Sequence, residues 1–423
     1  MQPETNHAAP PDPARGLPPV VPPSGRFLAQ LFLVPGLIVA FVVALLLGAN
    51  WLLGGARTPE QFLQNLDNPN PEVRWRAADD LAQVLLRDER LASDPRFALD
   101  LAARLRRALE AAEPAEQAYA ERVRKEPAGE NDPERKKIEA NRNYIHYLMA
   151  CLSDFIVPAG MPVLKDLAEK PDVAAEADAL GGRRREATWP SRRTEAVWAL
   201  GKLGENVRRF ETFPPERRQP VLDYLHEQAA GTDPERAEAA KAAAVLLGEP
   251  AGDSPRLLGL DEVFDKCASD GDPFLRMMTA LALNFWEGST LENARLDGTL
   301  ARLAQTPDGE DGTQAREVRY NAAIALARRG SARARVDLLQ EMLDEDRQRQ
   351  NFRLRAKDGS DAADEATAQT TVLNALRATA ELHRKRPDQD LEGIPSAVEK
   401  LTHSSATPLR KEAEQTLAAL GGK

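Results

Sequence analysis

Cysteine and aromatic residues are scarce in this sequence. Two cysteines, Cys151 and Cys267, stand among 423 residues, which excludes a disulfide framework and a Cys-x-x-Cys metal site. Both lie in apolar segments, so we expect them to be small residues of a core. Aromatic residues make up 5% of the chain, while alanine, leucine, glutamate and arginine are abundant. This composition favours helix over sheet.

Recognisable catalytic motifs are also missing. The sequence has neither a Gly-x-Ser-x-Gly nucleophile elbow nor a phosphate-binding P-loop. The segment HEQAA at 226–230 begins like a zinc-protease motif but lacks the second histidine, and the five histidines are scattered. Acidic residues are spread over every helical face, so no acid/base pair stands out. We therefore predict no catalytic residue, no metal and no cofactor.

Positive charge is in deficit. The formal net charge is −10, and 29% of the residues are charged. Phosphate contacts require a basic surface, so no nucleic-acid binding is expected. The length suits several domains or one elongated array better than a single core.

Charge is absent altogether between Phe27 and Ala56. Within this stretch, Leu31–Ala49 has no polar side chain, and 19 residues make about 28 Å of helix, near the thickness of a bilayer core. We predict a single transmembrane helix in residues 27–56 that contacts the membrane through residues 27–53. Residues 1–26, which are polar and rich in proline, are expected to be disordered.

The alternative for this apolar run is a cleaved signal peptide, with Gly54 and Ala56 before the cut. The run is long for a signal peptide and starts far from the N-terminus, which favours an anchor. Arg15 and Arg26 precede it closely, and only Arg57 follows it equally closely. The positive-inside rule then predicts a single-pass protein of the cell membrane with its main domain outside the cytoplasm.

A short pattern recurs along the rest of the chain: an arginine, a small residue three positions later and a leucine seven positions later. Positions +3 and +7 lie on one helical face, where the small residue permits close approach of a neighbouring helix. The copies begin at Arg74, Arg193, Arg276, Arg319 and Arg410, with a degenerate copy at Ala237.

Glycine follows eleven residues after the origin in four copies, at Gly204, Gly248, Gly330 and Gly421. Glycine at this place is expected to end each helix. A shorter amphipathic segment precedes each copy, so the unit is helix, turn, helix. The origins at 193, 237, 276 and 319 are spaced by 44, 39 and 43 residues, and a period near 40 is typical of a helical solenoid.

Stretches such as PEVRWRAADDL and REVRYNAAIALARRG resemble the second helix of a HEAT repeat. The resemblance implies an all-α, right-handed α–α superhelix over residues 57–423, interrupted by charged insertions near 113–137 and 347–366. It also implies that the repeat arginines Arg74, Arg193, Arg276, Arg319 and Arg410 are structural seam residues. In that family such an arginine joins an acid near the turn of an adjacent unit, for which Asp67, Asp272 and Asp311 are the candidates.

The segment GGRRREATWPSRR, at 181–193, concentrates arginine in an acidic chain. One interpretation is a solvated loop. The other is a partner-binding site in which Arg183, Arg184, Arg185 and Arg192 contact an acidic segment, because guanidinium groups pair well with carboxylates and phosphates. Trp189, Trp198 and Trp286 either line a groove or pack in the core.

These features predict a membrane-anchored HEAT-like scaffold that mediates protein–protein interaction without catalysis. The partner protein is not identified by the sequence. The alternative is an enzyme or enzyme accessory, since some HEAT-like proteins resemble bilin lyases and others resemble DNA-alkylation glycosylases. The acidic balance and the predicted anchor weigh against the glycosylase.

Overall fold

The computed structural model describes residues 39, 41–43, 59–126, 132–180, 189–248, 259–286, 293–307, 312–355 and 361–421. The chain forms two compact units, residues 1–58 and 59–423. The predicted tail at 1–26 and nearly all of the predicted transmembrane segment at 27–56 lie outside the described residues. The exceptions, Val39 and Phe41–Val43, are helical and exposed. Among the residues that are described, no helix is both long and apolar enough to cross a bilayer.

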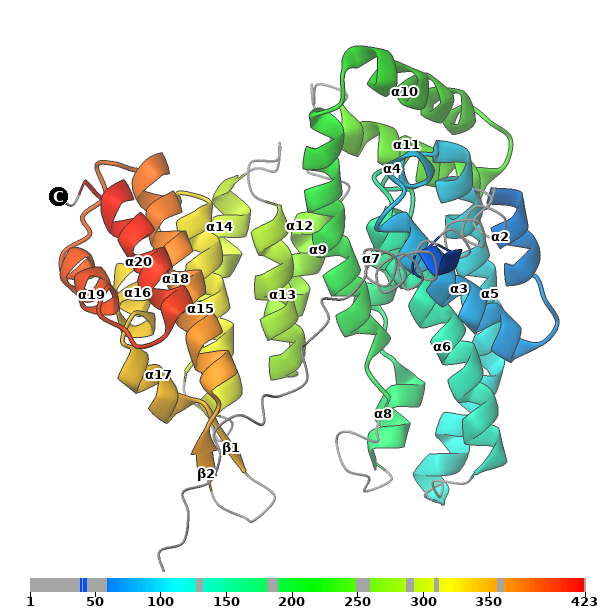
Figure 1. The fold of residues 1–423 in the computed structure, drawn as a ribbon. Coiled ribbons are helices and arrows are strands. Elements are labelled where there is room, and N and C mark those ends of the chain that lie inside the picture. The colour runs from blue at the N-terminus through cyan, green and yellow to red at the C-terminus, as the bar shows by residue number, and fades with distance from the viewer. Residues whose placement is uncertain are drawn as a thin grey trace, which may run out of the picture. The chain divides into compact units, whose positions relative to one another are not determined.

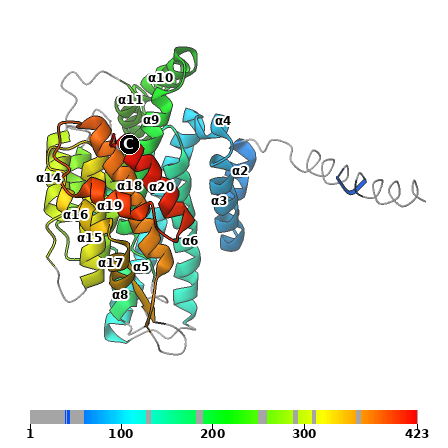
Figure 2. The same cartoon turned by 60° about the vertical axis from the view of Figure 1, so that its left-hand side comes forward.

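The second unit is mostly helical, as the composition predicts. Seven helices form one row, here called row B, in which each helix packs against the next (Figure 1). Row B consists of α3 (Pro71–Leu85), α6 (Pro133–Asp154), α9 (Arg192–Glu211), α13 (Pro273–Phe285), α15 (Gly312–Arg328), α18 (Glu365–Lys385) and α20 (Thr407–Ala419). Figure 2 shows the row ending in α18 and α20, with α19 beside them.

Shorter helices pack against row B and are here called row A. They are α2 (Pro59–Leu66), α7 (Met161–Glu169), α12 (Leu260–Ala268), α14 (Asn293–Leu303), α16 (Val336–Met342) and α19 (Ile394–Leu401). The remaining elements are α4 (Glu89–Ala92), α5 (Pro95–Lys125), α8 (Val173–Leu180), α10 (Pro215–Ala229), α11 (Pro234–Leu247), α17 (Glu345–Asn351), β1 (Arg353–Arg355) and β2 (Asp361–Ala363).

The repeated sequence pattern accounts for the packing of row B. The small residues at +3 are at most 8% exposed: Ala77, Ala196, Thr279, Ala322 and Ala413. The leucines at +7 in the copies from Arg74, Arg193, Arg276 and Arg319 are fully buried. An aspartate or asparagine commonly precedes the helix and caps it; the Asp272 carboxylate, for example, accepts the Phe274 N–H at 2.9 Å. The helices therefore begin and pack where the pattern places them.

The predicted glycine ends are found at Gly248, Gly330 and Gly421, which have positive φ. The prediction is wrong for Gly204, because α9 continues to Glu211. A Cβ on Gly204 would lie 2.7 Å from the Trp286 ring, and one on Gly201 would lie 2.6 Å from the Ala282 Cα. These two glycines instead allow α9 and α13 to approach closely.

The degenerate copy at Ala237 does not continue the row. It lies in α11, which pairs with α10 and packs on α5, α7 and α9, whereas α9 packs directly on α13. Even spacing along the sequence therefore does not mean consecutive places in the stack. This copy lacks the arginine and the leucine, and the residues that α11 buries are mostly alanines, followed by Leu246 and Leu247.

The two charged insertions contain regular structure. The first, predicted at 113–137, continues α5 as far as Lys125 and contributes the start of α6; residues 127–131 are not described. Its inward face buries Glu116, Tyr119 and Val123. The second, at 347–366, contains α17 and a two-stranded antiparallel hairpin in which Arg353 lies opposite Ala363.

Apolar residues collect in two large cores and one small one. The large cores follow the helical rows. The small core contains Tyr119, Val123, Ile138, Ala177 and Trp189 among its members. It joins the second half of α5, the first half of α6 and α8, and we call this part the lobe (Figure 1).

Candidate functional site

The arginine cluster predicted from the sequence is placed only at its edges. Arg183, Arg184 and Arg185 lie outside the described residues. Arg192 is buried at the start of α9: its Nη1 donates to Glu116 Oε2 at 2.8 Å, and its Nη2 pairs with Oε1. Its backbone N–H donates to Asp172 Oδ2 at 2.9 Å. Arg192 is therefore a structural residue near the end of the 181–193 segment, which corrects its prediction as a partner-binding residue.

Two further arginines in the lobe form buried ion pairs. Arg142 donates to both carboxylate oxygens of Asp172, at 3.0 and 2.8 Å, and its Nη2 also donates to the Pro190 carbonyl at 2.9 Å. Arg135 donates to both oxygens of Asp178, at 3.0 and 3.2 Å. The Asp178 side chain is fully buried. It also accepts hydrogen bonds from the Tyr119 hydroxyl at 3.0 Å and from the backbone N–H of Trp189 at 3.3 Å.

Trp189 lies at the centre of this network. The guanidinium groups of Arg135 and Arg142 lie over its indole ring, 4.9 and 5.0 Å from the centroid. Its ring is 5.3 Å from that of Tyr119. Trp189 is thus a core residue of the lobe, and α8 and α9, which precede and follow residues 181–188 in the sequence, are both bound to buried charges.

The Asp172 carboxyl has a strongly perturbed pKa. Burial alone raises its pKa, but the hydrogen bonds and positive charge of Arg142, together with the Arg192 N–H, outweigh burial and lower the pKa to about 2. Asp172 is therefore ionised throughout the physiological range. The Asp172 carboxylate and the Arg142 guanidinium therefore form a pair of opposite charges at neutral pH.

The repeat arginines bind the turns of the stack. Arg193 donates through Nε to the Ala168 carbonyl at 3.2 Å and through Nη2 to Asp270 at 2.8 Å. These contacts connect α9 to the end of α7 and to the turn between α12 and α13. Asp270 is an acid in the turn of another helical pair, the kind of partner that the HEAT resemblance implies.

Three other repeat arginines bind backbone carbonyls of the turn that precedes their own helix. Arg276 binds the Asp270 carbonyl at 2.6 Å, Arg319 the Thr306 carbonyl at 3.0 Å and Arg410 the Ser404 carbonyl at 3.0 Å. Because a guanidinium group carries several donors in a fixed plane, it satisfies carbonyls that end the preceding helix. These contacts connect the two helices of one repeat unit and do not reach a neighbouring unit.

Arg74 behaves differently. Its Nη2 lies 3.4 Å from Asn141 Oδ1, and its guanidinium lies over the Tyr144 ring at 5.1 Å. Its proposed partner Asp67 pairs with Arg104, with an Nη2–Oδ2 distance of 3.0 Å. Of the other proposed acids, Asp272 caps α13 and Asp311 lies outside the described residues.

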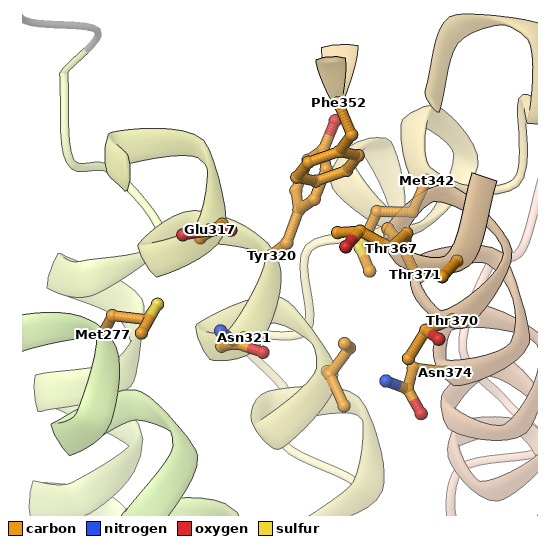
Figure 3. A pocket seen from close by; sticks show the side chains of 12 residues that line it. Met277, Glu317, Tyr320, Asn321, Met342, Phe352, Thr367, Thr370, Thr371 and Asn374 are labelled. Carbon is orange, nitrogen blue, oxygen red and sulfur yellow. The ribbon is translucent and has the colours of Figure 1, made fainter. Parts of the chain in front are cut away.

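A groove of about 290 Å³ opens on row B between α13, α15 and α18 (Figure 3). Its apolar lining includes Met277, Ile324, Met342 and Phe352, and its polar lining includes Asn321, Thr370 and Asn374. Figure 3 shows Tyr320 extending from α15 toward Phe352, while Asn374 lies on the facing helix. The groove therefore combines an apolar wall with amide and hydroxyl groups.

Tyr320 is held as a rigid part of that wall. Its hydroxyl donates to Glu341 at 2.7 Å. Burial, followed by the hydrogen bond and charge of Glu341, raises the pKa of Tyr320 to about 12, so the phenol remains neutral. The sequence interpretation overlooked this groove. A signal existed: Met277, Tyr320, Asn321 and Ile324 stand one, two or five residues after a repeat arginine.

Trp286, Trp198 and the two cysteines differ in their exposure. Trp286 is buried and donates its indole N–H to the Leu200 carbonyl at 3.0 Å, whereas Trp198 on α9 is 36% exposed. Cys151 and Cys267 are buried free thiols. Over the part of the chain that the structure describes, no group of three or more His, Cys, Asp or Glu side chains is arranged to hold a metal ion.

Comparisons with known proteins give little guidance. No family model matches the chain, and no curated protein matches it. Among solved structures, human deoxyhypusine hydroxylase in complex with glycerol is 16% identical, with 86% of this chain and 96% of that chain covered and a TM-score of 0.23. An engineered protein is 15% identical, with 86% and 99% covered and a TM-score of 0.24. TM-scores this low carry no argument about fold or function.

Proposed function

We propose that this protein is a membrane-anchored, HEAT-like right-handed superhelix that binds a partner protein through the surface of row B, without catalysis. One observation carries the proposal. Large apolar side chains remain exposed on three helices of the row: Val73 on α3 is 39% exposed, Trp198 on α9 is 36% and Phe274 on α13 is 38%.

Exposed apolar side chains on one structural row support binding better than scattered ones do. A single exposed apolar residue is ordinary, so the proposal requires that one partner covers all three of these side chains. Tryptophan and phenylalanine contribute large apolar areas when a partner covers them. Stacked helices supply such a surface without any catalytic group.

The anchor belongs to the same proposal. The charge-free run in residues 27–56 supports insertion, and Arg15 and Arg26 support a main domain outside the cytoplasm. Alkaline carbonate extraction of membranes tests this part. The full-length protein is expected in the pellet, and its release into the supernatant would contradict the anchor.

The arginine loop supplies a second contact in the proposal. Arg183, Arg184 and Arg185 would meet an acidic segment of the partner, supported by the lobe that fixes both flanks of the loop and by the acidic balance of the rest of the chain. Changing all three to Ser is expected to weaken partner capture most at low salt, since screening acts over about 8–10 Å at physiological ionic strength. Equal capture at low salt would remove the loop from the interface.

Site-specific photocrosslinking in native membranes tests the scaffold itself. A photoreactive amino acid replaces Trp198 or Phe274 on row B, and Lys266, whose side chain on α12 in row A is 67% exposed, provides the matched control. Crosslinks to the same partner from both row B positions, and none from Lys266, are the expected result. Crosslinks only from Lys266 would overturn the proposed surface.

A further inference from the structure

We propose that the groove between α13, α15 and α18 binds an extended, uncharged peptide segment of the partner and accepts one large aliphatic side chain beside Tyr320 and Phe352. This inference rests on the proposed function and specifies the chemistry of the bound segment. It concerns described residues alone and is independent of the arginine loop.

The size of the groove favours a strand-like peptide. Ligand pockets for small molecules and cofactors commonly measure about 300–1,000 Å³, and this groove, at about 290 Å³, is at the lower limit. A helix with side chains is about 10–12 Å wide, so one full turn of it occupies more than this volume. One inserted side chain with its flanking backbone fits the available volume.

The charge of the lining argues against anionic ligands. Glu317 is the single charged residue among the twelve that line the groove. The lining contains no lysine or arginine, so a phosphate, a nucleic acid or an acidic peptide would find no pairing charge there. A neutral peptide segment needs no pairing charge in the groove.

Two side-chain amides supply the polar contacts. Asn321 on α15 and Asn374 on α18 are half-buried, and within the described residues neither side chain has a protein hydrogen-bond partner. Each amide offers a donor and an acceptor, which is the same pair that a peptide backbone unit presents. Thr370, which is exposed at the rim, adds a hydroxyl.

The direction of the groove sets the length of the segment. Its lining runs from Met277 on α13 across α15 to Asn374 on α18. Three successive helices at about 8–10 Å axial separation span roughly 16–20 Å. An extended chain rises about 3.3 Å per residue, so five or six residues cross the groove.

A phage-displayed library of random heptapeptides provides the probe, selected against the full-length chain in detergent micelles. Counter-selection uses Thr370→Arg, which places a long charged side chain at the rim. The expected winners carry Leu, Ile or Met at one fixed position and have few charged residues. Acidic winners, or no enrichment at all, would overturn the inference.

Measured affinities of the winning peptides then identify the groove. Binding is expected to fall at least tenfold in Asn321→Ala/Asn374→Ala and to disappear in Thr370→Arg. Asn143→Ala on α6 and Gln415→Arg on α20 are matched controls, since both positions are exposed outside the groove, and they should bind like the parent. Equal binding by all five proteins would contradict the site.

The two proposals fail separately. If row B crosslinks to the partner but the peptides bind the groove variants as tightly as the parent, the scaffold stands and the groove assignment falls. If the peptides respond to the groove variants but Trp198 and Phe274 capture no partner, the groove stands and the proposed contact at Trp198 and Phe274 falls.

Discussion

The contact between α9 and α13 and the lobe at α5, α6 and α8 are held together in different ways. In the first, Gly201 and Gly204 let two helices approach closely, and Trp286 fills the layer between them. In the second, a small apolar core surrounds buried ion pairs, among them Arg135–Asp178, whose carboxylate is fully buried. One region depends on shape, and the other depends on matched charge.

The difference matters because the two kinds of contact respond differently to damage. A packed apolar contact loses stability in proportion to the atoms that are removed or forced together. A buried ion pair adds little net stability while complete, but removal of one partner leaves an uncompensated charge in the interior. The lobe should therefore be the more fragile region toward single substitutions.

The largest effect is expected from Asp178→Ala. This change leaves the Arg135 guanidinium, the Tyr119 hydroxyl and the Trp189 backbone N–H without their shared acceptor. The loss should reach about 3–5 kcal/mol of unfolding free energy, or local unfolding of the lobe. Denaturant titration measures it. Glu139→Ala is the control, because the exposed Glu139 also contacts Arg135, at 3.5 Å, yet should cost less than about 1 kcal/mol.

The next effect depends on pH and concerns Asp172→Asn. The folded-state pKa of Asp172, about 2, lies below its ordinary value of 3.8, so the carboxylate stabilises the fold above about pH 4 and loses this contribution as the pH falls through about 2. The variant should be less stable than the parent by about 2 kcal/mol at pH 7, and the difference should shrink below pH 4. Urea titrations at several pH values check this; a difference that stays constant down to pH 2 would contradict it.

A smaller effect is expected from Gly201→Ala at the α9–α13 contact. The added methyl would lie 2.6 Å from the Ala282 Cα, and overpacking should exceed the usual gain of helix propensity, leaving a net loss of about 1–2 kcal/mol. In Gly271→Ala the added methyl has no atom within 4 Å, so that control should melt like the parent or slightly higher. Equal melting temperatures for the two variants would mean that α9 and α13 move apart to accommodate the added methyl at little cost in stability.

The smallest effect belongs to the repeat arginines. Arg276→Ala removes hydrogen bonds to carbonyls of its own turn and should cost about 1 kcal/mol. Arg193→Ala should cost more, because it also leaves Asp270 without its partner across two helical pairs. Thermal melts of both variants test the order, and a reversed order would contradict the distinction between contacts within a unit and contacts between units.

The local sequence pattern was sufficient to predict which faces of the row B helices are buried. Small residues at +3 and leucines at +7 predict the buried faces of α3, α9, α13 and α15, because helical spacing is a short-range property. Gly330 likewise ends α15 with φ of +64°. The rule that this glycine ends the helix failed at Gly204, because Gly204 packs against Trp286, which is 82 positions away along the chain. Tertiary packing there overrides the local preference.

The ion pairs of the lobe could not be predicted from a local sequence pattern. Arg192 and Glu116 are separated by 76 residues, and Arg135 and Asp178 by 43. Each looks like an ordinary surface charge in the sequence, and only the fold brings them together. The groove could be predicted in part, since Asn321 follows the repeat arginine Arg319 by two positions, but Asn374 lies on a helix that holds none of the predicted repeat arginines.

Hydrogen–deuterium exchange of the full-length chain and its Asp178→Ala variant tests most directly whether charge holds the lobe and shape holds the stack. We expect faster exchange in α8 and in the lobe halves of α5 and α6, with unchanged protection in α13 and α15. Equal acceleration along both regions, or no acceleration in α8, would contradict this account.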